Sequence, residues 1–143
     1  MLHNKEFPAR REFLPQMLTE ITDEVKKYFT DDKWINRLKV CSEEILVNII
    51  DYSSSKKVFV TCEFDEAENA LRFEFADEGK LYNPLEEVPK VDIEEDIDDR
   101  SIGGLGIFLY TTIMDKLEYN SDDGKNHLTA YKKLFDGGDF LEK

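Results

Sequence analysis

Residues 57–75, KVFVTCEFDEAENALRFEF, decide the fold that the sequence predicts. Apolar side chains occupy every second position on both sides of the turn sequence DEAEN: Val58, Val60, Cys62 and Phe64 before it, and Leu71, Phe73 and Phe75 after it. Alternation with a period of two is typical of strands that bury one face and expose the other. The stretch therefore predicts an antiparallel hairpin whose apolar side faces the core.

Three segments have apolar residues at helical spacing, and we expect helices over 15–29, 33–52 and 105–115. In the second helix the run ILVNII is apolar except for Asn48, which predicts a buried helix. In and just before the first helix the apolar stripe allows two interpretations, part of the core or part of a dimer face; its members are Phe13, Met17, Ile21 and Val25.

Further strands are expected at 4–9, 116–121 and 127–135, the last two joined by the turn sequence DDGKN. No internal repeat or linker divides the chain, so we expect a single domain over 1–143. Its predicted fold is an α/β two-layer sandwich, with three helices on one face of a mixed, largely antiparallel sheet.

The composition excludes several classes of function. A formal net charge of −13 argues against a nucleic-acid-binding surface, because phosphate backbones would be repelled. No apolar run approaches the ~20 residues that a membrane-spanning helix requires, and the N-terminal residues lack the apolar core of a secretory signal. We therefore expect a cytoplasmic protein that binds small molecules or proteins, with Cys41 and Cys62 as free, buried thiols.

The glycine run in RSIGGLGIFL, residues 100–109, is the first candidate for binding chemistry. Gly103, Gly104 and Gly106 place unhindered N–H groups at the start of a predicted helix, where the helix dipole favours a phosphate. The alternative is a flexible hinge that happens to precede a helix.

The second candidate is the pair Glu44 and Asn48, which are four residues apart and so share one face of the predicted helix. An amide oxygen suits a Mg²⁺ ion that is also bound by phosphates, and the neighbouring carboxylate could accept a proton. The alternative is a core asparagine bonded to the backbone, with Glu44 in solvent.

The third candidate is FADEGKLYNP, residues 75–84, where Asp77 directly follows a predicted strand. A carboxylate at the lip of an apolar pocket can accept a hydrogen bond from an exocyclic amine such as that of adenine. Gly79 would allow close approach to the backbone. The alternative is an ordinary turn, for which Asp-x-Gly is common.

These three segments, in this order, resemble the GHKL ATPase superfamily. EEILVN resembles its N box, DEGKLYNP its first glycine box and GGLGIFL its second. The short chain and the form RSIGGLGIFL resemble the stand-alone anti-sigma-factor serine kinases of bacteria and their relatives, and the resemblance spans about residues 6–134. It implies the Bergerat ATP-binding fold of the histidine kinase-like ATPases.

The resemblance also implies roles for individual residues. Asn48 would bind Mg²⁺, Asp77 would accept the adenine amine, and Gly79 would let the adenine ring approach. Glu44 would be the general base, and residues 85–102, rich in acids, would form a mobile lid over ATP. The implied nucleotide-binding set is completed by Asn83, Arg100, Gly103, Gly104, Leu105 and Gly106, and Asn126 matches the position that opens the last strand motif.

Departures from the family pattern keep two functions open. Tyr52 stands where the anti-sigma kinases usually carry His, and Tyr82 replaces the usual Phe. The resemblance implies a Mg²⁺- and ATP-dependent serine/threonine kinase that regulates transcription by phosphorylating an antagonist protein. A sigma factor would be a further partner, and the chain could form a homodimer. The alternative is a module that binds nucleotide without turnover and presents its first helix to a partner protein. A histidine kinase is disfavoured, because His3 and His127 are expected to be surface residues.

Overall fold

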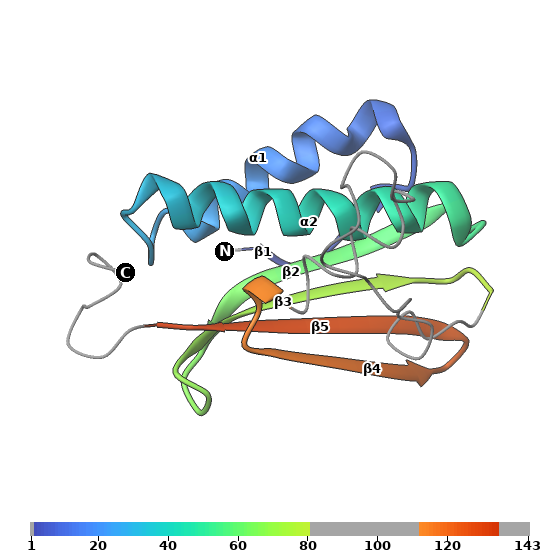
Figure 1. Ribbon diagram of the computed structural model, residues 1–143. Coiled ribbons are helices and arrows are strands. Elements are labelled where there is room, and N and C mark those ends of the chain that lie inside the picture. The colour runs from blue at the N-terminus through green and yellow to red at the C-terminus, as the bar shows by residue number, and fades with distance from the viewer. Residues whose placement is uncertain (1, 81–111, 135–143) are drawn as a thin grey trace, which may run out of the picture.

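The computed structural model describes residues 2–80 and 112–134, which form two layers (Figure 1). One layer is a sheet with the strand order β1-β2-β3-β5-β4. Its strands are β1 (Leu2–Pro8), β2 (Lys57–Asp65), β3 (Ala70–Asp77), β4 (Lys116–Asp122) and β5 (Lys125–Lys133). The other layer contains α1 (Leu14–Val25) and α2 (Asp32–Tyr52), and the short 3-10 helix η1 (Arg11–Phe13) leads into α1.

The hairpin predicted over 57–75 is confirmed. Strands β2 and β3 pair antiparallel from Val58 opposite Asp77 to Asp65 opposite Ala70. Within the described residues all the strand pairings are antiparallel, so the expectation of a mixed sheet was wrong for this part of the chain. The described ranges contain two α-helices instead of three, because the helix predicted over 105–115 lies almost entirely outside them.

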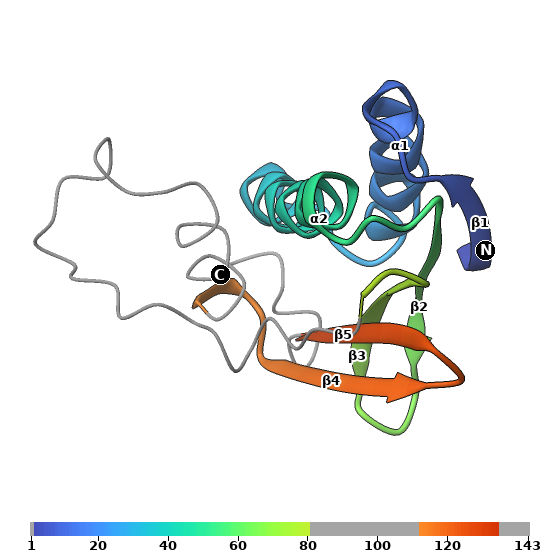
Figure 2. The ribbon, with the colours of Figure 1, turned by 90° about the vertical axis from the view of Figure 1, so that its right-hand side faces the viewer.

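The two helices cover the same face of the sheet, with α1 over β1 and β2 and α2 over β3 (Figure 2). Met17, Ile21 and Val25 of α1 are at most 1% exposed, which assigns the stripe on the first helix to the core. Each fully buried side chain of this size stabilises the fold by about 1.5–3 kcal/mol. The sheet contributes Val58, Val60, Leu71, Phe73 and Phe75 to the same core.

Helix α2 is buried along one stripe and not all round. In the run ILVNII, Ile45, Leu46 and Ile49 are buried, but Val47 and Ile50 are only half-buried. The expectation that this run is buried all round was therefore wrong, because within the described residues α2 packs mainly against α1 and β3. At the other end of the helix the carboxylate of Asp31 caps it by accepting a hydrogen bond from the N–H of Lys33 at 2.9 Å.

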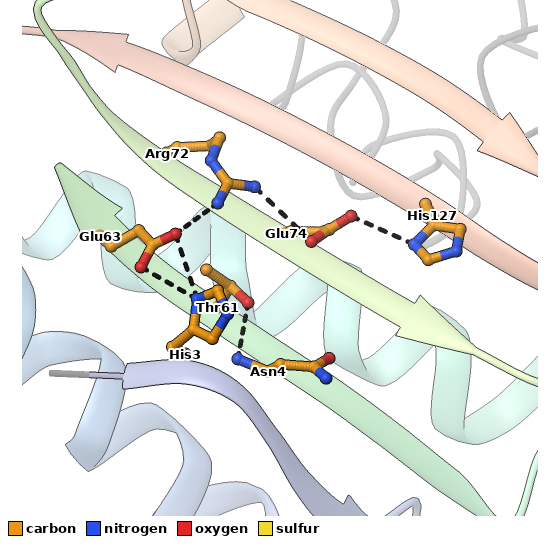
Figure 3. Close-up of polar contacts among 7 residues, drawn as sticks. All are labelled: His3, Asn4, Thr61, Glu63, Arg72, Glu74 and His127. Carbon is orange, nitrogen blue, oxygen red and sulfur yellow. Dashed lines mark hydrogen bonds and ion pairs between the residues drawn. The ribbon is translucent and has the colours of Figure 1, made fainter. Parts of the chain in front are cut away.

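The outer face of the sheet, away from the helices, carries a polar ladder (Figure 3). Arg72 of β3 hydrogen-bonds Glu63 of β2, and its second terminal nitrogen lies 3.6 Å from Glu74. The Nδ1 atom of His3 lies 3.1 Å from Glu63, and that of His127 lies 3.1 Å from Glu74. These contacts link four neighbouring strands from β1 to β5, which agrees with the expectation that both histidines are surface residues.

The end of β3 is fastened to the end of α2 by a junction of backbone and serine groups. The carbonyl oxygen of Ser53 accepts a hydrogen bond from the N–H of Lys80 at 3.1 Å. The hydroxyl of Ser55 accepts one from the N–H of Glu78 at 3.0 Å. A Cβ atom on Gly79 would lie 1.9 Å from the Ser53 carbonyl oxygen, so only glycine fits there.

Two further expectations concern the membrane and the thiols. Within residues 2–80 and 112–134, no helix is both long and apolar enough to cross a membrane. Cys41 and Cys62 are buried thiols that are not joined in a disulfide, as expected. Burial raises the pKa of Cys41 to about 12, with a smaller contribution from the charge of Glu44. Burial also raises the pKa of Cys62.

The junction predicts that Gly79→Ala is strongly destabilising, because the methyl group would overlap a backbone carbonyl that cannot rotate away. We expect a loss of about 3 kcal/mol, the upper end of the range for overpacking. Urea unfolding followed by circular dichroism measures it. Gly124→Ala is the control: its Cβ meets no atom within 4 Å, and only its φ of +75° is unfavourable, at about 1 kcal/mol. Equal stabilities of the two variants would contradict the account of the junction.

The buried thiols predict that the native protein does not react with Ellman's reagent at pH 8. Thiolate is the reactive form, and burial keeps both thiols protonated well above this pH. In urea both cysteines should react, as counted by absorbance. A Cys41→Ala variant should release one equivalent on unfolding and none before. Rapid labelling of the folded protein would show that a thiol is accessible.

Candidate functional site

Asp77 closes β3 with a buried carboxylate, 5% exposed. Its Oδ1 atom accepts hydrogen bonds from the backbone N–H of Gly79 at 2.9 Å and from the side-chain amide of Asn126 at 3.0 Å. The first of these bonds closes a local turn from Asp77 to Gly79, which is the alternative that the sequence analysis allowed for this segment. Both bonds end on Oδ1, and Oδ2 makes none with the described residues.

Asn126 lies opposite Asp77 in the register between β3 and β5. Its side chain is buried, at 7% exposed, and its Nδ2 atom donates to the carbonyl oxygen of Lys80 at 2.9 Å as well as to Asp77. The sequence offered only a weak indication for this residue. The structure brings it into direct contact with Asp77, and so adds it to the candidate site.

Tyr119 of β4 was missed by the sequence analysis. Its hydroxyl donates a hydrogen bond to the Oδ1 atom of Asn126. Nothing in the local sequence marks this tyrosine, since its partner depends on how β4 and β5 pair. The sequence analysis expected a strand over KLEYNS but could not identify its contacts.

Glu44 and Asn48 lie on the same face of α2, as their spacing predicted, and both are half-buried. Burial raises the pKa of Glu44, and the charge of the neighbouring Glu43 adds to the effect. Glu44 is therefore not simply in solvent, and its carboxylate accepts a proton more readily than an exposed one would. That property suits a general base.

The junction at Ser53 brings the two parts of the site to one end of the molecule. Asn48 precedes Ser53 by five residues, or about 7.5 Å along the helix axis, and Glu44 by nine, or about 13.5 Å. In Figure 1, α2 and β3 end, and β5 begins, at this same end. Asp77 and Asn126 are therefore at the end of the protein that the last turns of α2 approach.

Gly79 lies so close to the backbone of Ser53 that no side chain fits at this position. The role that the sequence resemblance implied for this glycine, approach of the adenine ring, stays a prediction. The contact with Ser53 was not predicted, because it joins residues 26 positions apart in the chain. The sequence did not single out Ser53 or Ser55.

Several predicted site residues lie outside the described residues. They are Asn83, Arg100, Gly103, Gly104, Leu105 and Gly106, together with the proposed lid over 85–102 and the departure at Tyr82. Their implied roles stay predictions. Within residues 2–80 and 112–134, no group of three or more His, Cys, Asp and Glu side chains could hold a metal ion.

Comparison with known proteins gives a consistent result. The family model described as "Histidine kinase-like ATPase domain" matches residues 7–132. Serine-protein kinase RsbW of Halalkalibacterium halodurans is 27% identical over 122 residues, which cover 82% of this chain and 74% of that protein. Serine/threonine-protein kinase BtrW of Bordetella bronchiseptica is 28% identical over 104 residues, covering 68% of this chain and 72% of BtrW.

Two solved structures with similar folds are histidine kinases. The histidine kinase AdeS of Acinetobacter baumannii matches 93% of this chain and 69% of its own, with a TM-score of 0.50 and 14% identity. The histidine kinase domain of a blue-light activated kinase from Erythrobacter litoralis matches 94% of this chain and 65% of its own, with a TM-score of 0.54 and 12% identity. At these identities the similarity shows the fold alone. Since the family model spans most of the sequence, the chain belongs to the histidine kinase-like ATPase domain family.

Proposed function

We propose that this protein binds ATP with Mg²⁺ and transfers the γ-phosphoryl group to a serine or threonine of a partner protein. One observation carries the proposal. The buried carboxylate of Asp77 keeps one oxygen without a hydrogen bond from the described residues, at the end of the molecule approached by the part of α2 that bears Glu44 and Asn48.

Asp77 would recognise the adenine base. Its Oδ1 atom already accepts two hydrogen bonds, so Oδ2 is the atom available to the exocyclic amine. A carboxylate is an acceptor only, and it therefore favours an amine over an oxo group at that position of the base. This assignment supports a nucleotide site that prefers adenine.

Asn48 would hold Mg²⁺ through its side-chain carbonyl oxygen. Mg²⁺ is usually bound by one or two protein groups together with phosphates and water, so a full set of protein ligands is not required. When bound, the ion would neutralise charge on the phosphates. The amides of Gly103, Gly104, Leu105 and Gly106 would bind these phosphates, with Asn83 and Arg100 as further contacts and residues 85–102 as the lid.

Glu44 would accept the proton of the attacking hydroxyl. As the serine or threonine oxygen bonds to the γ-phosphorus, the bond to the ADP oxygen breaks, and the hydroxyl proton passes to the carboxylate. The raised pKa of Glu44, caused first by its burial, favours this proton transfer. The products are ADP and a phosphorylated partner protein.

The relatives named as serine-protein kinases support a role in switching a protein partner. We propose an antagonist protein as the phosphorylated partner and a sigma factor as the regulated one, in a cytoplasmic pathway that controls transcription. A homodimer is part of the same proposal.

A second candidate is a module that binds ATP or ADP without turnover and presents a surface to a partner. The observation that favours it is Tyr52, which is 72% exposed and stands where the resembled kinases usually carry His. It lies on the same face of α2 as Glu44 and Asn48, eight and four residues further along.

The nucleotide site predicts Mg²⁺-dependent binding of ATP that is lost in Asp77→Asn. The variant replaces one carboxylate oxygen by an amide donor, so the adenine amine loses a charge-assisted acceptor worth about 1.5–3 kcal/mol, or roughly 10- to 150-fold in affinity. Calorimetric titration with and without Mg²⁺ measures this. Asp123→Asn, at the tip of the hairpin between β4 and β5, is the control and should bind as the unchanged protein does. Absence of binding at millimolar ATP would exclude the kinase.

The raised pKa of Glu44 predicts that Glu44→Gln stabilises the fold at neutral pH. Because the folded state holds this proton more tightly than the unfolded chain, the contribution of Glu44 to stability is fully present below about pH 4.3. That contribution is lost as the pH rises through the higher folded pKa. Urea unfolding should therefore show Glu44→Gln as more stable than the unchanged protein at pH 7 and equal to it in acid. Glu66→Gln, at an exposed turn position, should show neither effect.

The same variant separates the two candidate functions. If Glu44 is the general base, Glu44→Gln binds ATP but no longer phosphorylates a partner. Transfer of labelled phosphate to proteins co-purified with the chain reports this step. If the partner is retained equally by both proteins and neither labels it, the module that binds without turnover is the better description.

A further inference from the structure

Three adjacent strands each place one polar side chain near the end of the sheet where β3 ends. They are Asp77 of β3, Asn126 of β5 and Tyr119 of β4. Asn126 lies opposite Asp77, while Tyr119 lies opposite Leu128, two residues further along β5. This diagonal spacing is within reach of an aromatic side chain. A chain of hydrogen bonds therefore runs from β4, through Asn126, to Asp77.

Three hydrogen bonds hold the side-chain amide of Asn126, and one of them comes from the hydroxyl of Tyr119. The Nδ2 atom of Asn126 faces two oxygen acceptors, Oδ1 of Asp77 at 3.0 Å and the carbonyl of Lys80 at 2.9 Å. Its Oδ1 atom faces the hydroxyl of Tyr119, which can donate. Turning the amide over would place its oxygen against a carboxylate and a carbonyl, and its NH₂ group against the hydroxyl. The two acceptors therefore set the orientation in which Asn126 donates to Asp77, and the hydrogen bond from Tyr119 holds the amide in that position.

The orientation of Asn126 determines what Asp77 can offer to a ligand. With two donors on Oδ1, the carboxylate is held in place. Oδ2 then remains as a fixed acceptor. Without the donor from Asn126, the N–H of Gly79 is the one remaining hydrogen-bond donor to the carboxylate among the described residues, and the carboxylate is held less firmly.

We propose that Tyr119 is a positioning residue that sets the preference of the site for an amino-substituted purine. It acts through Asn126 on Asp77 and touches neither the base nor the phosphates. The inference rests on the proposed function, since it assumes that Asp77 reads the exocyclic amine of adenine. The inference adds to that function that the selectivity for the base depends on a hydroxyl group on β4, two side chains away from the ligand.

The test compares the affinities of the full chain for ADP and for inosine diphosphate, in which an oxo group replaces the amine. Calorimetry measures both dissociation constants for the unchanged protein and for Tyr119→Phe, which keeps the aromatic ring and removes only the hydroxyl. We expect ADP to bind up to about tenfold more weakly to the variant, the loss of roughly one neutral hydrogen bond. The affinity for inosine diphosphate should stay the same, so the ratio of the two affinities falls.

Tyr131→Phe is the matched control. It removes a phenol hydroxyl from β5 at a position that pairs with Arg72 and Lys116, away from Asp77. Its ratio of affinities should equal that of the unchanged protein. In an Asn126→Leu background, Tyr119→Phe should cause no further change in the ratio, because the residue through which it acts is gone.

The outcomes separate the inference from the proposed function. If the unchanged protein prefers ADP and Tyr119→Phe keeps the full preference, the inference is wrong and the nucleotide site stands. A weakening of both nucleotides by the same factor in Tyr119→Phe would also overturn it, since that is the effect of a general loss of structure. If the unchanged protein binds neither nucleotide, the proposed function itself fails.

Discussion

The contact between Gly79 and the carbonyl of Ser53 constrains the whole arrangement of the site. At this contact the segment that follows β3 packs against the segment that follows α2. Two hydrogen bonds join the same segments, one from the N–H of Lys80 to the carbonyl of Ser53 and one from the N–H of Glu78 to the hydroxyl of Ser55. Asp77 lies two residues before Gly79, and Asn48 lies little more than one helical turn before Ser53. Because the two segments are joined here, neither Asp77 nor Asn48 can shift along its own strand or helix without straining the junction.

The apolar core between the helices and the sheet stabilises this arrangement. α1 and α2 bury their stripes on the same side of the sheet that carries Phe73 and Phe75, four and two residues before Asp77. Close packing of these large rings fixes the register of β3 beneath α2. The polar groups at the end of β3 are therefore held by a rigid core, although they lie at its margin.

The parts of the structure that sequence could predict are those determined by neighbours in the chain. Alternation located the hairpin of β2 and β3, and helical spacing placed Glu44 beside Asn48. The sequence analysis found only a weak indication of Asn126, the partner of Asp77. Asn126 is 49 residues away, and its position depends on the pairing of β3 with β5. The same limit applies to Gly79, where the sequence indicated a need for glycine but not the carbonyl group that creates it. The extent of burial of α2 was also misjudged, since an apolar run does not say how much of a helix has neighbours.

The polar ladder on the outer face of the sheet has a consequence for self-association. Each glutamate of the ladder is shared between Arg72 and a histidine, and these side chains, except that of the exposed His3, are only partly exposed. Covering this face with a second copy would strip water from several charges at once, and their mutual attraction seldom repays that desolvation. The ladder therefore works against pairing of two chains through the open sheet. A dimer is better accommodated by the outer surface of the helices or by a strand edge, which leaves the sheet face in water.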